Sequence, residues 1–210
     1  MIWMEFALTG IFAGFLAGYL GIGGGLVLVP ALSWIFSRDP ATAGVAVQMA
    51  VATSLATMLF SSLSSVLAHH HRRAILWPQV RLLLPGLLIG ALLGAVIADR
   101  ISSASLGNVF GVFALLVGLQ LLRGSAQPGN RPLPGRLPTA GIGFAIGSVS
   151  SLLGIGGGSM TVPWFLWHGQ QTRKAIATAA ACGYPIAVAG TLGFILLGGN
   201  DSGTLTLGYV

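Results

Sequence analysis

One glycine cluster occurs twice in this sequence. Gly-Ile-Gly-Gly-Gly occupies residues 21–25 and again residues 154–158, each time within apolar sequence. A Val-Pro pair follows each copy at the same distance, at 29–30 and at 162–163. Each glycine in a helix interior costs about 1 kcal/mol relative to alanine, so consecutive glycines disrupt a helix. The duplication therefore predicts two related units, each beginning with a helix that is broken at its glycines.

The composition indicates that a lipid bilayer surrounds the chain. Of 210 residues, 54% are hydrophobic and 7% are charged, whereas soluble domains carry about 25% charged residues. The net charge of +6 does not indicate a nucleic-acid partner, because the Lys and Arg residues are scattered over short connections and form no face. The single cysteine, Cys182, allows no intrachain disulfide and no cysteine cluster. We expect neither a metal nor a cofactor, and membrane lipid as the surrounding partner.

The first part of the chain, residues 1–123, forms the first membrane repeat. Its first apolar stretch, residues 6–36, is longer than the ~20 residues that one span needs. We expect two half-helices there, at 6–20 and 24–36. Uninterrupted spans are expected at 44–67, which is rich in Ser and Thr, at 82–98 and at 104–122.

A polar linker divides the chain. Residues 124–138 are rich in proline, glycine and arginine, a composition typical of a connection between structured units. The second broken stretch follows at 139–167 and a further span at about 175–198. We expect residues 139–210 to be a second repeat that is incomplete, because the sequence ends a few residues after this span.

The positive charges predict that the two repeats are inverted. Positively charged connections mark the cytoplasmic side, and two of them, at 69–81 and in the linker, are separated by two expected spans. In the second repeat the positive connection, Arg173-Lys174, comes directly after the broken stretch, which is the flip that an inverted repeat requires. Residues 139–167 would then be a re-entrant hairpin. A broken helix that crosses the membrane fully is the alternative. The sequence thus predicts an all-α, polytopic membrane protein.

The glycine breaks are the candidate binding site. A helix that restarts inside a membrane presents free N–H groups and the positive end of its dipole. In an inverted pair two such ends can converge near the middle of the membrane and bind an anion. The substrate-binding residues expected on this ground are Gly23, Gly24, Gly25, Gly156, Gly157 and Gly158, helped by the hydroxyls of Thr53, Ser54, Ser159, Thr161 and Thr178.

Other residues fit simpler roles. Glycines within uninterrupted spans are expected to permit close helix packing, and all four carboxylates lie at segment ends, which argues against a proton relay. The sequence offers no nucleophile–base set, so we do not expect an enzyme. The glycines assigned to packing are Gly86, Gly90, Gly94, Gly107 and Gly111.

The duplicated motif resembles the TauE/SafE sulfite exporter family. The resemblance rests on residues 20–26 with Val29-Pro30, their repeat at 153–159, and the Ala-Val-Ala-Thr-Ser run at 50–54. It implies a multi-pass carrier of the bacterial inner membrane that moves small anions such as sulfite and sulfonates. With the inverted repeats it predicts transport by alternating access. An anion channel and a non-transporting membrane subunit remain the alternatives. The substrate, the direction of transport and the oligomeric state stay open.

Overall fold

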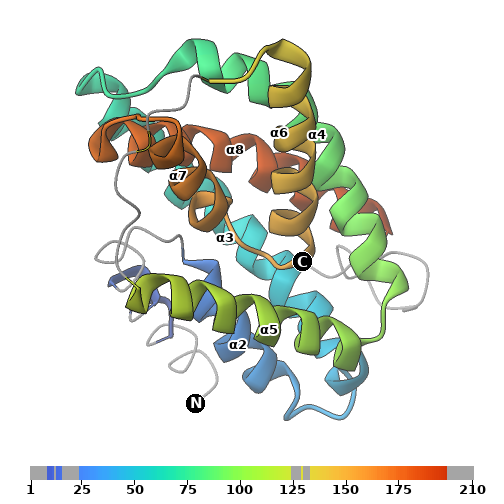
Figure 1. The fold of residues 1–210 in the computed structure, drawn as a ribbon. Helices are drawn as coiled ribbons and strands as arrows, with labels where there is room; N and C mark the ends of the chain where they lie inside the picture. Colours follow the sequence, from blue (N-terminus) through green and yellow to red (C-terminus); the bar gives the residue numbers. More distant parts are fainter. Residues whose placement is uncertain (1–8, 12, 16–23, 124–128, 130–132, 198–210) are drawn as a thin grey trace.

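A computed structural model describes residues 9–11, 13–15, 24–123, 129 and 133–197 of the chain. These residues form helices and no strand (Figure 1). Within this described part of the chain, four segments are long and apolar enough to cross a membrane, namely Ala43–His71, Trp77–Arg100, Ser103–Leu122 and Thr172–Leu197. The helices are α2 (Gly25–Phe36), the 3₁₀ turn η1 (Ala43–Val45), α3 (Ala46–His71), α4 (Trp77–Arg100), α5 (Ser103–Leu122), α6 (Arg136–Leu152), α7 (Gly158–Trp167) and α8 (Thr172–Leu197).

The expected all-α, polytopic membrane fold is confirmed, and the helix bounds lie within a few residues of the predicted ones. Local sequence explains several of the ends. Pro78 lies in the first turn of α4, where its missing N–H costs nothing. Ser102 caps α5 by accepting a hydrogen bond from the Ser105 N–H at 3.3 Å. The first predicted break, between the half-helices expected at 6–20 and 24–36, falls on residues 21–23, which lie outside the described residues.

A stripe of glycines joins α4 to α6. Cβ atoms added at Gly86, Gly90 and Gly94 would overlap backbone carbonyl oxygens of α6, and Gly143 of α6 faces the Leu83 carbonyl in the same way. The backbones of the two helices therefore lie in direct contact, which only residues without a side chain permit. The packing prediction is confirmed for these three glycines of α4. It is wrong for Gly107 and Gly111 in α5, because Gly107 has one ordinary contact and no described atom lies within 4 Å of a Cβ at Gly111.

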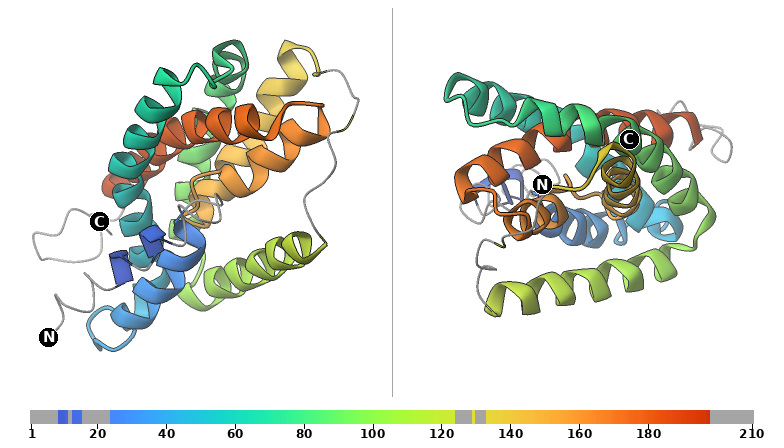
Figure 2. Two further views of the ribbon diagram at one scale, coloured as in Figure 1. Left: turned by 90° about the vertical axis from the view of Figure 1, so that its left-hand side faces the viewer. Right: turned by 45° about the horizontal axis from the view of Figure 1, so that its top comes forward.

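The remaining helices repeat one arrangement. α2 packs on α3, α7 packs on α8, and α3 packs directly on α8. α5 lies apart from this bundle and contacts chiefly α3 (Figure 2). Its Val112, Leu115 and Leu116 are exposed. In a chain with several membrane-spanning segments, lipid is the expected cover for that apolar face.

The second broken stretch folds as a hairpin. α6 runs toward the break at residues 153–157 and α7 returns from it (Figure 1). The end of α7 lies against the linker, because the Gly129 N–H donates to the Leu166 carbonyl at 2.9 Å. Leu133, just before α6, packs against the same hydrophobic cluster as Phe165 and Leu166. The hairpin has the shape that the re-entrant alternative requires, and its placement in a bilayer stays a prediction.

Candidate functional site

The two glycine clusters meet in the folded chain. Gly25, the first residue of α2, lies against the second break, where a Cβ would overlap the Gly154 carbonyl oxygen and approach the Ile155 Cα at 2.9 Å. The two clusters are far apart in the sequence, so tertiary packing alone brings them together. Gly23, also predicted for the site, lies outside the described residues.

The second break depends on two glycines with positive φ angles. Gly154 has φ +67° and Gly157 has φ +72°, conformations that side chains strongly disfavour. Between them the chain makes short turns, in which the Ile155 N–H donates to the Ser150 carbonyl and the Gly157 N–H to the Ile155 carbonyl, both at 2.8 Å. α7 then restarts directly from Gly157.

Two of the predicted hydroxyls hold this break in place. Ser54 Oγ of α3 donates to the Gly154 carbonyl at 2.9 Å, and Thr161 Oγ1 donates to the Gly157 carbonyl at 2.7 Å. Both residues are fully buried. Ser54 therefore satisfies a carbonyl that accepts no backbone hydrogen bond from the described residues, whereas the Gly157 carbonyl also accepts from the Thr161 N–H of α7 at 2.8 Å.

Replacing Ser54 with alanine is expected to destabilise the fold, because the Gly154 carbonyl would remain buried without this donor. Leaving a buried carbonyl without a donor lowers the free energy of unfolding by about 1–3 kcal/mol. Each kcal/mol lowers Tm by about 2–4 °C in a chain of this size. Thermal unfolding in detergent measures the effect. Ser64→Ala, at an exposed position of the same helix, is the control. Equal Tm values for the two variants would show that the Ser54–Gly154 bond contributes nothing.

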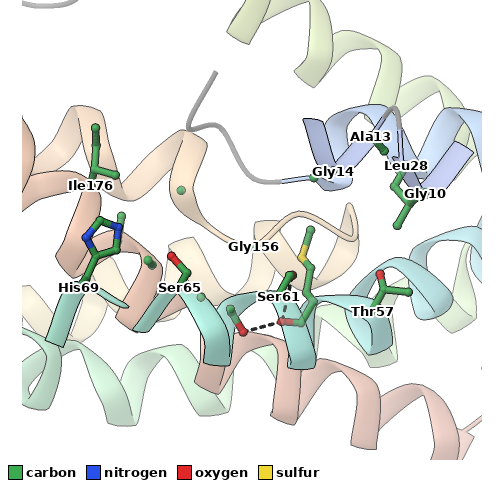
Figure 3. A pocket seen from close by; sticks show the side chains of 17 residues that line it. Gly10, Ala13, Gly14, Leu28, Thr57, Ser61, Ser65, His69, Gly156 and Ile176 are labelled. Carbon is green, nitrogen blue, oxygen red and sulfur yellow. Dashed lines mark hydrogen bonds between the residues drawn. The ribbon is translucent and has the colours of Figure 1, made fainter. Parts of the chain in front are cut away.

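A cavity of about 490 Å³ opens beside the break. Three of the predicted glycines line it, Gly24 from the first cluster and Gly156 and Gly158 from the second. One wall belongs to α3 and the other to α8 (Figure 3). The remaining lining residues are Gly10, Ala13, Gly14, Leu28, Thr57, Met58, Ser61, Ser62, Ser65, His69, Ile176, Ala179, Ala180 and Gly183.

The wall formed by α3 is polar. Thr57, Ser61, Ser65 and His69 are four residues apart, so they share one face of the helix, and Figure 3 shows them in succession along α3. The α8 wall carries only apolar side chains and glycine. The sequence-based prediction missed this polar face. The four-residue spacing of the hydroxyls was the signal that could have found it.

Three other predicted hydroxyls do not line the cavity. Thr178 Oγ1 donates to the Lys174 carbonyl at 2.7 Å and accepts from the Leu76 N–H at 3.0 Å, so it ties α8 to the start of α4. Thr53 lies one turn before Thr57 on the same face of α3, is half-buried, and does not line the cavity. Ser159 Oγ is buried without a hydrogen-bond partner among the described residues.

The start of α7 offers hydrogen-bond donors next to the cavity. Within the described part of the chain the N–H groups of Gly158 and Ser159 have no acceptor, and the positive end of the helix dipole lies there. Of the described residues, none that lines the cavity is Asp, Glu, Lys or Arg. The described chain also contains no group of three His, Cys, Asp or Glu side chains that could hold a metal ion.

Comparison with known proteins identifies similar chains. The family model described as sulfite exporter TauE/SafE matches residues 6–210. A probable membrane transporter protein of Haemophilus influenzae is 30% identical over 207 residues, which are 97% of this chain and 78% of the relative. The probable membrane transporter protein YunE of Bacillus subtilis is 31% identical over 182 residues, 78% of this chain and 67% of the relative. No solved structure matches.

The matches agree with the fold and with the duplicated motif. The family model includes both glycine clusters and all four candidate spans. The relatives are named as membrane transporters, which is consistent with the expectation that this chain is not an enzyme. The chain therefore belongs to the sulfite exporter TauE/SafE family and is a multi-pass membrane transporter protein.

Proposed function

We propose that this transporter moves small anions, such as sulfite, sulfonates or related sulfur-containing compounds, across the bacterial inner membrane. The observation that carries the proposal is the meeting of Gly24, Gly156 and Gly158 at one cavity with a hydroxyl-lined wall. Its volume of about 490 Å³ is within the ~300–1,000 Å³ typical of small-molecule sites. The family description, which names sulfite, supplies the substrate class.

The chemistry of the cavity favours an anion. Backbone N–H groups at the start of α7, its helix dipole and the α3 hydroxyls can all direct positive charge toward a ligand. A cation would need carboxylates or several converging carbonyls, and none of the described lining residues is Asp or Glu. Backbone donors also avoid the cost of burying a charged side chain inside a membrane.

The position of the cavity supports alternating access. It lies between α3 of the first repeat and α8 of the second, so a rocking motion of one repeat against the other would open it to one side and then to the other. The inverted orientation of the repeats and the re-entrant placement of α6 and α7 are parts of this proposal. The small anion and the surrounding lipid are the partners that the mechanism needs.

Replacing Gly156 with leucine is expected to reduce sulfite flux to background without loss of the fold. A Cβ at Gly156 would meet only the flexible Met58 side chain, with Sδ at 3.2 Å, so the leucine can be accommodated while it occupies the cavity. Sulfite uptake into proteoliposomes measures the flux. Gly118→Leu in α5, where no described atom lies within 4 Å, is the control.

The outcomes of this experiment separate the alternatives. Full flux in a folded Gly156→Leu protein would remove this cavity from the transport route. Saturable flux in the wild type, with accelerated exchange against internal sulfite, supports a carrier. Flux that rises linearly with concentration instead supports a channel. Wild-type protein that moves neither sulfite nor sulfoacetate contradicts the proposed substrate class.

A further inference from the structure

The cavity extends well beyond the glycine break. From Thr57 to His69 the lining face of α3 extends over twelve residue steps, which at 1.5 Å per step is about 18 Å. Figure 3 shows His69 at one end of the labelled α3 side chains, beside Ile176 of α8. A small anion bound at the break would therefore not reach His69. The break does not explain what the His69 end of the cavity binds.

His69 differs from the other described histidines. His70 Nδ1 accepts a hydrogen bond from Trp77 Nε1 at 3.3 Å, and His168 Nδ1 lies 2.7 Å from the Trp164 carbonyl. His71 is exposed and does not line the cavity. His69 is half-buried, lines the cavity, and has no hydrogen-bond partner for either ring nitrogen among the described residues.

The surroundings of His69 are cationic. Arg72 follows it by one turn, and Arg173 lies at the start of α8. Both guanidinium groups are close enough to interact electrostatically with the imidazole, and neither lines the cavity itself. The described carboxylates, Asp39 and Asp99, do not line the cavity. Clustered positive charge at the end of a cavity with low-dielectric walls raises the local concentration of anions.

We propose that His69 is a second anion-binding residue, which receives the substrate at the cationic end of the cavity before it reaches the glycine break. Its imidazole donates an N–H to the anion, and the Ser65 and Ser61 hydroxyls lead along α3 toward Gly156. This inference rests on the proposed anion transport, because it assigns a further residue to the same cavity.

The test compares two neighbouring histidines. Sulfite affinity is measured by calorimetry on the purified chain in lipid nanodiscs, for the wild type, His69→Leu, His69→Gln and His71→Leu. A hydrogen bond to a charged group contributes enough that its loss should weaken binding roughly tenfold or more. We expect that loss for His69→Leu, substantial recovery for His69→Gln, which keeps an N–H donor, and wild-type affinity for His71→Leu.

Each other outcome overturns the proposal in an identifiable way. Unchanged affinity in His69→Leu, with wild-type flux, removes His69 from the route and leaves the transport function intact. Equal weakening in His69→Leu and His71→Leu shows a general effect of surface charge, which also overturns a specific site. Absence of sulfite binding and sulfite flux in the wild type overturns the proposed function and this inference together. Equal Tm values across the four proteins exclude unfolding as the cause.

Discussion

Gly25→Leu is expected to abolish sulfite flux and to lower the melting temperature sharply. Gly25 begins α2 at the point where the two glycine clusters meet, and a Cβ there would overlap the Gly154 carbonyl oxygen. The Ile155 Cα lies 2.9 Å from the same point. Both obstacles are backbone atoms of a loop that is itself held by Ser54, so no side-chain movement can make room.

The cost of this substitution should reach about 3 kcal/mol or more, at or above the upper end of overpacking effects. Thermal unfolding and sulfite uptake, measured on the same preparation, report the two consequences. Gly111→Leu introduces the same side chain in α5, where no described atom lies within 4 Å, and is expected to leave both measurements near wild type. A Gly25→Leu protein with wild-type Tm and flux would show that the clusters are not in contact.

Gly25→Leu and Gly156→Leu should have different signatures, and the difference follows from what each glycine contacts. Gly25 faces backbone, so its substitution affects stability and flux together. Gly156 faces the Met58 side chain and the cavity, so its substitution affects flux alone. The pair therefore separates the structural role of the clusters, which is to let α2 lie against the second break, from their proposed role in binding.

The helices were predictable because each depends on local sequence. Long apolar segments and short polar connections locate α3, α4, α5 and α8 to within a few residues. The break before α7 was predictable for the same reason, since consecutive glycines oppose a helix wherever it packs. The membrane class follows from composition alone, because a chain with 7% charged residues cannot cover a water-facing surface.

The hydroxyls that line the cavity were not predictable in this way. α3 carries Ser and Thr on several faces, and its neighbours bury both polar and apolar positions. Burial therefore does not separate Thr57 and Ser61, which line the cavity, from Thr53, which does not. Which face borders the cavity is decided by where α8 and the second break pack against α3, and those contacts join residues far apart in the sequence.

The predicted hydroxyls failed to line the cavity for a related physical reason. A broken helix leaves carbonyls without helical partners, and in an apolar environment these groups must be satisfied within the protein. Ser54, which packs on the break from α3, satisfies one of those carbonyls, that of Gly154. A hydroxyl that packs directly on the break is thus used to stabilise the break, while the lining hydroxyls begin at Thr57 and lie further along α3.

Gly90→Leu is expected to cause the other large loss of stability, at the joint between α4 and α6. A Cβ at Gly90 would overlap the Phe144 carbonyl oxygen and lie 2.9 Å from the Ser148 N. α6 cannot move away locally, because Gly86 and Gly94 hold it on both sides of Gly90 in the same manner. The two helices would have to separate along most of their length, which removes the contacts between α4 and α6.

Gly90→Leu should lower the free energy of unfolding by about 3 kcal/mol or more. Gly90→Ala should already show a large part of this decrease, because the Cβ itself makes the overlap. Thermal unfolding of Gly90→Ala, Gly90→Leu and the α5 control Gly111→Ala measures the series. Flux in Gly90→Ala, measured below its Tm, adds a second test. If α4 and α6 act as the fixed joint about which the repeats move, a folded variant retains sulfite binding while its transport rate falls. If Gly90→Ala and Gly111→Ala have the same Tm, the close contact of the two backbones is refuted.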